Sequence, residues 1–75
     1  MTKYYLLRSH EDSDLFYEVK DDQCNLTYFD DATIFSTRER AEESLIKFAG
    51  EWYRKGYIMN LVEIDLVKNT FTILR

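Results

Sequence analysis

Hydrophobic residues recur with the period of a helix in the second half of the chain, and this is its strongest pattern. Their spacing of three and four residues defines one face of a helix over residues 36–55. The positions on this face are Ala41, Leu45, Phe48, Ala49 and Trp52, with Ile46 and Tyr53 widening the stripe on one flank. On the charged opposite side, Glu43 and Lys47 predict an ion pair one turn apart. We therefore expect the aromatic stripe of this helix to pack into the core.

Both ends of the helix carry recognisable signals. Ser36 and Glu39 have the spacing of a capping box, in which each side chain bonds the backbone amide of the other residue. Gly56 follows the helix where a left-handed cap is wanted. Gly50 lies inside the helix, where glycine is unfavourable, and it therefore predicts a close approach of the helix to a sheet.

Shorter segments on either side of the helix have the composition and alternation of β-strands. They are residues 3–8, 15–20, 25–29, 58–66 and 70–74, separated by polar turns. Residues 32–35 are also expected to be extended, and to deliver Ile34 and Phe35 to the core just before the helix.

In the strand that follows the helix, the hydrophobic positions suggest which side is buried. Ile58, Val62, Ile64 and Leu66 fall on one face, and Glu63 and Asp65 fall on the other beside Met59 and Leu61. We therefore expect Met59 and Leu61 to point outward.

These elements predict one α+β domain over residues 1–75. Its expected architecture is an antiparallel sheet of four to five strands with one long helix on one face, in the order β-β-(β)-α-β-β. One helix covers only one face of such a sheet, so the other face is either solvated or binds a partner.

The net charge of −4 changes this picture because the negative charge is concentrated in one part of the chain. Residues 9–31 contain eight acidic residues and a single base, Lys20. Such a balance argues against direct binding to nucleic acid or to an anionic membrane. The single cysteine, Cys24, suits a reducing compartment, and the apolar run Tyr4–Leu7 is too short for a signal peptide or a membrane span. We therefore expect a cytoplasmic protein.

The sequence contains no pattern typical of an enzyme. His10 lies in an acidic turn without a nucleophile in a recognisable motif, so we interpret it as a solvated turn residue. The acids that start at Glu11 lack the alternation and the glycine of a calcium-binding loop. Cys24 has no nearby second thiol or histidine, and there is no glycine-rich phosphate loop. We expect no catalytic residues, no metal and no cofactor.

The acidic segment has two interpretations. One is a set of solvated turns that keeps a small domain soluble. The other is a negative surface that docks a basic groove by imitating a nucleic-acid backbone, with tyrosines as anchors. The candidate partner-binding residues are Glu11, Asp12, Asp14, Asp21, Asp22, Asp30 and Asp31, with Tyr17 and Tyr28.

One stretch also carries a resemblance to known proteins. The residues Phe35–Glu42 (FSTRERAE), preceded by short tyrosine-rich strands and followed by Val62-Glu63-Ile64, resemble a pattern common in small phage and prophage proteins. Some of these are anti-defence proteins, including anti-CRISPRs that have a β-sheet and one helix. The resemblance implies a non-enzymatic protein of the host-cell cytoplasm. Such a protein inhibits a host nuclease complex with a basic groove, such as a CRISPR–Cas effector, by stoichiometric binding.

An alternative function is a structural or regulatory module that forms a homodimer or larger homo-oligomer. In this alternative the second face of the sheet, including Met59 and Leu61, pairs with itself.

Overall fold

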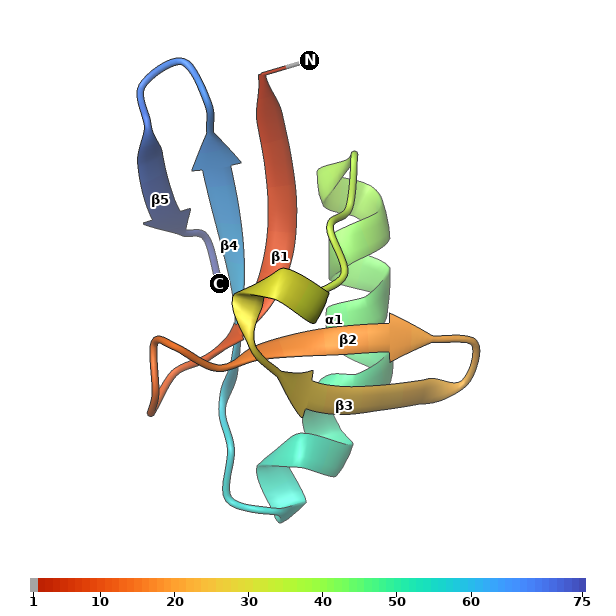
Figure 1. Ribbon diagram of the computed structural model, residues 1–75. Coiled ribbons are helices and arrows are strands. Elements are labelled where there is room, and N and C mark those ends of the chain that lie inside the picture. Colours follow the sequence, from red (N-terminus) through yellow and green to blue (C-terminus); the bar gives the residue numbers. More distant parts are fainter. Residues whose placement is uncertain (1) are drawn as a thin grey trace.

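The computed structural model describes residues 2–75 and has one helix packed against a five-stranded antiparallel sheet, as predicted (Figure 1). The strands are ordered β3-β2-β1-β4-β5 across the sheet. The elements are β1 (Lys3–Ser9), β2 (Phe16–Lys20), β3 (Gln23–Thr27), a 3₁₀ turn η1 (Phe29–Asp31), α1 (Arg38–Arg54), β4 (Met59–Asp65) and β5 (Thr70–Ile73). The fold is therefore of the α+β class.

The long strands β1 and β4 form the centre of the sheet. Seven consecutive residue pairs join them, from Lys3 opposite Asp65 to Ser9 opposite Met59. Successive side chains on a strand point to opposite faces, and both faces of this pair are apolar. Consequently Leu6, Leu7 and Leu61 are all fully buried.

The hairpin of β2 and β3 crosses this centre at a steep angle and meets it only at Arg8 opposite Phe16 (Figure 1). The segment before α1 fills the gap beyond that point. Phe35 exchanges both backbone hydrogen bonds with Tyr5 of β1, at 2.8 and 3.0 Å. The Thr33 hydroxyl accepts from the amide of Val19 of β2 at 2.7 Å and donates to its carbonyl at 3.3 Å. Residues 33–35 thus join the two halves of the sheet.

The extended conformation predicted for residues 32–35 is confirmed, but only one of its two apolar residues reaches the core. Phe35 packs against the buried cluster under the helix, as expected. Ile34 is 55% exposed, so the prediction that it is buried was wrong. Backbone pairing with β1 turns the Phe35 ring toward α1, whereas Ile34 is left on the opposite side of the sheet.

The third strand begins two residues earlier than predicted because the β2–β3 turn is tight. Only Asp21 and Asp22 separate the paired residues Lys20 and Gln23. Asp21 adopts the left-handed region with φ of 52°, which aspartate tolerates better than most residues. As a result residues 28 and 29 lie beyond the end of β3.

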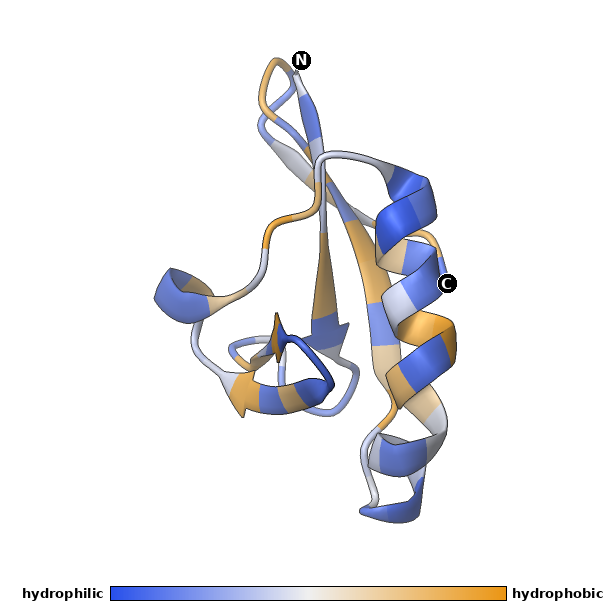
Figure 2. Cartoon of the chain, turned by 90° about the vertical axis from the view of Figure 1, so that its right-hand side faces the viewer, coloured by the Kyte–Doolittle hydropathy of each residue, from blue (hydrophilic) through white to orange (hydrophobic). Residues whose placement is uncertain are grey.

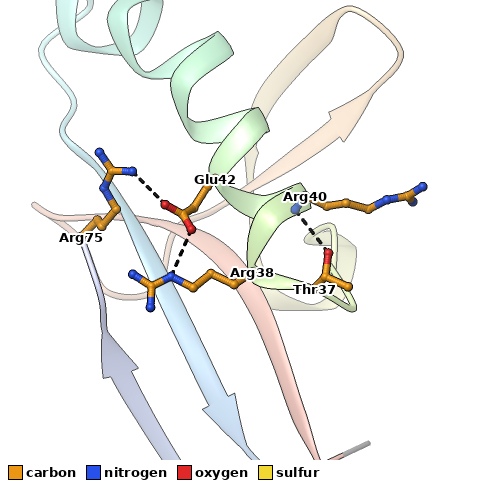
Figure 3. A network of polar contacts seen from close by, with 5 residues as sticks. All are labelled: Thr37, Arg38, Arg40, Glu42 and Arg75. Atoms are coloured by element: carbon orange, nitrogen blue, oxygen red, sulfur yellow. Dashed lines mark hydrogen bonds and ion pairs between the residues drawn. The ribbon is translucent and has the colours of Figure 1, made fainter.

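The helix begins one residue later than predicted, and the Ser36–Glu39 capping box does not form. The N-cap is Thr37, whose hydroxyl accepts from the amide of Arg40 at 3.3 Å (Figure 3). Thr37 is itself a good N-cap residue. The two candidates are adjacent, and the backbone pairing of Phe35 with β1 keeps the chain extended through them.

The charged side of the helix pairs differently from the prediction. Lys47 reaches Asp22 of the β2–β3 turn at 3.0 Å instead of Glu43. The ion pair one turn apart is Arg38–Glu42, at 3.1 Å, and Arg75 binds the other oxygen of Glu42 at 3.0 Å (Figure 3). This network attaches the C-terminal segment to the start of α1.

The apolar stripe of α1 is narrower than predicted. Ala41, Leu45, Phe48 and Trp52 are buried, as expected, and Ala49 packs beside them. The flanking residues Ile46 and Tyr53 are 72% and 70% exposed, so the predicted widening of the buried stripe was wrong. Both side chains therefore project into solvent.

The predictions made for the two glycines had different outcomes. Gly56 has φ of 95°, and the amide of Tyr57 bonds back to the carbonyl of Trp52 at 3.0 Å, which confirms the left-handed cap. Gly50 is exposed, and a Cβ there would meet nothing closer than Arg54 Nη1 at 4.0 Å. The predicted close approach of the sheet at Gly50 was therefore wrong.

The prediction for β4 assigned its two faces incorrectly. Met59 and Leu61 do not point outward but lie in the core under α1. Val62 and Ile64 are buried on the opposite face, where Ala32 packs against Ile64, Leu6 and Phe16. This also removes Met59 and Leu61 from any self-pairing surface.

Candidate functional site

The seven acidic residues predicted to bind a partner occupy connecting segments at the two ends of the β2–β3 hairpin. Glu11, Asp12 and Asp14 lie in the β1–β2 loop, and Asp30 and Asp31 lie in η1. Both segments are at the end where β2 begins and β3 finishes (Figure 1). Asp21 and Asp22 form the turn at the other end. Five residues of extended strand separate the two groups by about 17 Å.

The loop and η1 come together around an exposed aromatic pair. Asp14, Tyr28, Phe29 and Asp30 line a hollow of about 360 Å³, which we call the acidic hollow. Tyr28 is 69% exposed and Phe29 is 45% exposed. Within residues 2–75, no lysine or arginine lies within ion-pair distance of Asp14, Asp30 or Asp31. The hollow therefore presents uncompensated negative charge beside aromatic surface.

Two carboxylates of the β1–β2 loop accept hydrogen bonds that stabilise the fold. Glu11 accepts from the amide of Ile58 at 3.1 Å and from the Ser9 hydroxyl at 3.4 Å. The bond from Ile58 lowers the pKa of Glu11 below its ordinary value. Asp12 accepts from the amide of Asp14 at 2.9 Å and so shapes the loop. Asp14 is left as the loop carboxylate that is open to a partner.

At the far end of the hairpin, the two turn aspartates also differ. Asp22 pairs with Lys47, but its side chain is 93% exposed, so water screens this contact strongly. Asp21 supplies the positive φ that the turn requires. These two residues form a second, smaller negative site that is separated from the acidic hollow by the length of β2.

The structure places Tyr17 in the core, so the prediction that it anchors a partner was wrong. Its ring is fully buried and meets Trp52 edge to face at 5.3 Å between centroids. Burial raises the pKa of its hydroxyl to about 12, and that hydroxyl has no hydrogen-bond partner within residues 2–75. The alternation of residues 15–20 correctly predicts that Tyr17 lies on one face of a strand, but that face is covered by α1.

An apolar groove that the sequence did not predict lies beside the acidic hollow. Its lining residues are Tyr4, Phe29, Ile34, Ile64, Leu66 and Phe71, which enclose about 280 Å³. The groove lies on the face of the sheet opposite α1, which we call the open face; Figure 2 shows α1 on one side of the sheet and η1 on the other. Phe29 lines both the groove and the acidic hollow, and its ring centroid lies 5.4 Å from that of Phe16 and 6.4 Å from that of Phe71.

The groove and the hollow share Phe29, so they form one continuous surface with an apolar centre and an acidic border. Protein interfaces commonly have this anatomy, with aromatic anchors in the middle and polar groups around them. The sequence contains a partial signal for this surface, because Tyr4 with Leu6, and Phe71 with Ile73, are apolar residues two apart on a strand. The signal is incomplete because Phe29 and Ile34 lie outside regular strands.

The two residues weighed for catalysis both contact other parts of the fold. His10 Nδ1 lies 3.0 Å from the side-chain oxygen of Asn60, near the start of β4. Cys24 is buried under α1, and burial raises the pKa of its thiol to about 11. Residues 2–75 contain no cluster of three or more histidine, cysteine or carboxylate side chains suited to a metal ion. None of the helices over this range is long and apolar enough to cross a membrane.

Comparisons with known proteins add no family to this description. No protein-family pattern, characterised sequence or solved structure matches the chain significantly.

Proposed function

We propose that this protein is a non-enzymatic inhibitor of a host defence nuclease complex. It binds stoichiometrically and uses its acidic surface to occupy a basic groove that normally holds nucleic acid. The resemblance to phage anti-defence proteins suggests a CRISPR–Cas effector in the host-cell cytoplasm as the target.

The observation that carries this proposal is the uncompensated acidic hollow beside exposed aromatic residues. Asp14 and Asp30 are exposed and have no basic partner within residues 2–75, so neither is needed for an internal ion pair. Tyr28 lines the same hollow and is 69% exposed. A partner rich in lysine and arginine would gain both charge complementarity and an aromatic anchor here.

The spacing of the acidic groups adds support. The hollow and the Asp21–Asp22 turn are about 17 Å apart, which corresponds to roughly five nucleotide steps of a DNA strand. A groove that contacts phosphates over this length spans the distance between the two groups. Because the attraction is between charges at the surface, the affinity should fall steeply as salt is added.

The test is inhibition of purified, guide-loaded CRISPR effector complexes of several types, measured by cleavage of labelled target DNA. We expect at least one complex to be fully inhibited near one inhibitor molecule per complex. Asp14→Lys combined with Asp30→Lys should abolish this inhibition.

The matched control is Glu43→Lys combined with Glu51→Lys on the exposed side of α1, which changes the net charge by the same amount. It should inhibit like the unmodified protein. Absence of inhibition across the panel, or equal loss in both double variants, would contradict the proposal.

A further inference from the structure

The outer edge of β5 is an unprotected strand edge. All four residues of β5 are exposed, and β5 is the last strand on its side of the sheet. Strand edges in soluble proteins usually carry a proline, a charged residue or a bulge that prevents pairing with another chain. The sequence of β5, Thr70-Phe71-Thr72-Ile73, has neither a proline nor a charge, and alternates threonine with large apolar residues.

The opposite edge of the sheet, on β3, is covered. The indole Nε1 of Trp52 donates to the carbonyl of Cys24 at 3.1 Å, and this carbonyl points away from β2. Neither strand contains a proline or a charge, and charged residues flank both, with Asp22 and Asp30 at β3 and Lys68 and Arg75 at β5. The two edges therefore differ in cover, because a side chain of α1 bonds the β3 edge whereas the β5 edge is open.

The hydrogen-bond direction along β5 shows which groups are free. The amide of Leu74 donates to the carbonyl of Leu61 on β4 at 2.8 Å. This direction alternates along an antiparallel strand, so Thr72 also turns toward β4. The amides and carbonyls of Phe71 and Ile73 consequently point outward, where no other strand of residues 2–75 meets them.

We propose that a second copy of this chain pairs with β5 and forms a two-fold symmetric dimer with a continuous sheet. Thr72 lies on the two-fold axis, and Phe71 of each copy pairs with Ile73 of the other. This register matches all the outward groups of Phe71 and Ile73, which gives four backbone hydrogen bonds. It also creates two aromatic–β-branched pairs on the open face, a favourable cross-strand combination.

The charges near β5 are compatible with this register. The paired residues are neutral, and Asn69 of one copy lies opposite Arg75 of the second copy. Arg75 is already held by Glu42 of its own chain at 3.0 Å. No like charges are therefore brought directly opposite each other.

The exposed apolar surface around β5 is sufficient for a weak dimer. On β5 itself, Phe71 is 50% exposed and Ile73 is 52% exposed. These two side chains offer about 200 Å² of apolar surface per copy. With the strand backbones, the two copies bury less than the roughly 1,000 Å² of a stable specific interface, so we expect a weak dimer with a dissociation constant of about 100 μM.

The two-fold axis is perpendicular to the continuous sheet, and this has a geometric consequence. Both copies then turn their open faces to the same side and both α1 helices to the other. The dimer would present two acidic hollows in one direction. Its formation can be measured without any partner, so the inference does not rest on the proposed function.

The test is sedimentation equilibrium of the full chain from low micromolar to submillimolar concentration. We expect a species of twice the 9.1 kDa chain mass that dissociates on dilution. Thr72→Lys should raise the dissociation constant at least about tenfold, because two ammonium groups then face each other across the axis.

Asn25→Lys is the matched control on the β3 edge. Asn25 is exposed and lies opposite Glu18, just as Thr72 is exposed and lies opposite Glu63. It should leave the dimer intact, with circular dichroism showing that both variants are folded.

A second variant keeps the test decisive if Thr72→Lys does not fold. Ile73→Pro removes an amide that points outward, so the hairpin with β4 keeps its bonds while the edge loses a donor. It should also be monomeric. Two results would overturn the proposal. One is an unmodified protein that is monomeric at submillimolar concentration, and the other is a dimer that persists in an edge variant shown to be folded.

Discussion

The two faces of the sheet are built from the same strands but have opposite properties. Under α1, nine buried residues form one closed core: Leu7, Tyr17, Cys24, Ala41, Leu45, Phe48, Trp52, Met59 and Leu61. On the open face, only Leu6, Phe16 and Ile64 form a buried cluster, and large apolar side chains around them stay exposed. Neighbouring residues of β1, such as Leu6 and Leu7, therefore belong to different environments.

This difference indicates that the two faces of the sheet contribute unequally to the stability of this small domain. Most of the stabilising burial is concentrated under α1, where aromatic rings pack edge to face around Trp52. The open face contributes less to stability, since its groove and its acidic hollow remain in water. An exposed surface that is apolar and charged at its border is typical of sites that bind other proteins, and it is the surface used in the proposed function.

The largest expected effect comes from truncating the closed core. Trp52→Ala should reduce the free energy of unfolding by about 3–5 kcal/mol, because it leaves a cavity under the helix and removes the donor to Cys24. Phe71→Ala on the open face should cost less than about 1 kcal/mol, since that ring is half exposed. Urea denaturation measures both. Equal losses would contradict the comparison between the faces.

A smaller effect is expected at the junction that holds the β2–β3 hairpin. Thr33→Val keeps the shape of the side chain but removes both bonds to Val19, which should cost about 1–3 kcal/mol. Thr70→Val is the control, because Thr70 is exposed on β5. Hydrogen exchange should show faster opening at Val19 in the first variant only. Unchanged exchange there would show that residues 33–35 do not hold the hairpin.

The start of α1 gives a smaller expected change. Thr37→Ala should destabilise the protein by about 1 kcal/mol, since it removes the acceptor for the Arg40 amide. Ser36→Ala, one residue earlier, should have almost no effect. Thermal or urea unfolding of the two variants compares them directly. The opposite order would mean that the helix begins at the capping box after all.

The smallest expected effect is the pH dependence at the β4–β5 turn. The amides of Lys68 and Val67 donate to Asp65 at 3.1 and 3.0 Å, and these bonds lower the pKa of its carboxyl. A pKa that is lower in the folded state adds stability above the unfolded value of about 4. That stability is lost as the pH falls through the folded pKa.

Urea unfolding at pH 6 and at successively lower pH values should therefore show a decline below about pH 4. This decline should be shallower in Asp65→Asn. Asp31→Asn is the control, because Asp31 is exposed and has no ion pair within residues 2–75. An equal change in both variants would exclude the bonds at the turn as the cause.

The sequence predicted those parts of the fold that depend on local periodicity. The spacing of Ala41, Leu45, Phe48 and Trp52 defined the buried side of α1, and Gly56 marked its end. Ser36 and Thr37 are equally suitable as the N-cap of α1, and local chemistry does not distinguish them. The backbone pairing of the preceding segment with β1 decides where the helix starts.

The faces of β4 could not be read from periodicity because burial there does not alternate. Residues 59–62 are all buried, since α1 covers one side and Ala32 with Phe16 covers part of the other. The same tertiary arrangement hid Tyr17 and created the groove around Phe29. These features depend on how the hairpin crosses the sheet, which no local pattern records.

The acidic residues of the candidate site can be named from the sequence, but their arrangement cannot. Seven acids were expected to act together, and the fold separates them into two groups at opposite ends of the hairpin. Glu11 and Asp12 also use their carboxylates to hold the β1–β2 loop. Sequence alone gives the number of charges, whereas their separation depends on the length and direction of β2.

The most direct test of the central claim, that the acidic hollow on the open face binds a partner and the exposed side of α1 does not, is a paired pull-down from bacterial lysate. Tagged protein, the Asp14→Lys/Asp30→Lys variant and the Glu43→Lys/Glu51→Lys control are compared at low and moderate salt, and retained proteins are identified by mass spectrometry. We expect a nucleic-acid-processing complex with the unmodified protein and the control at low salt, lost at moderate salt and absent with the open-face variant. Retention by the open-face variant but not by the control would contradict the account.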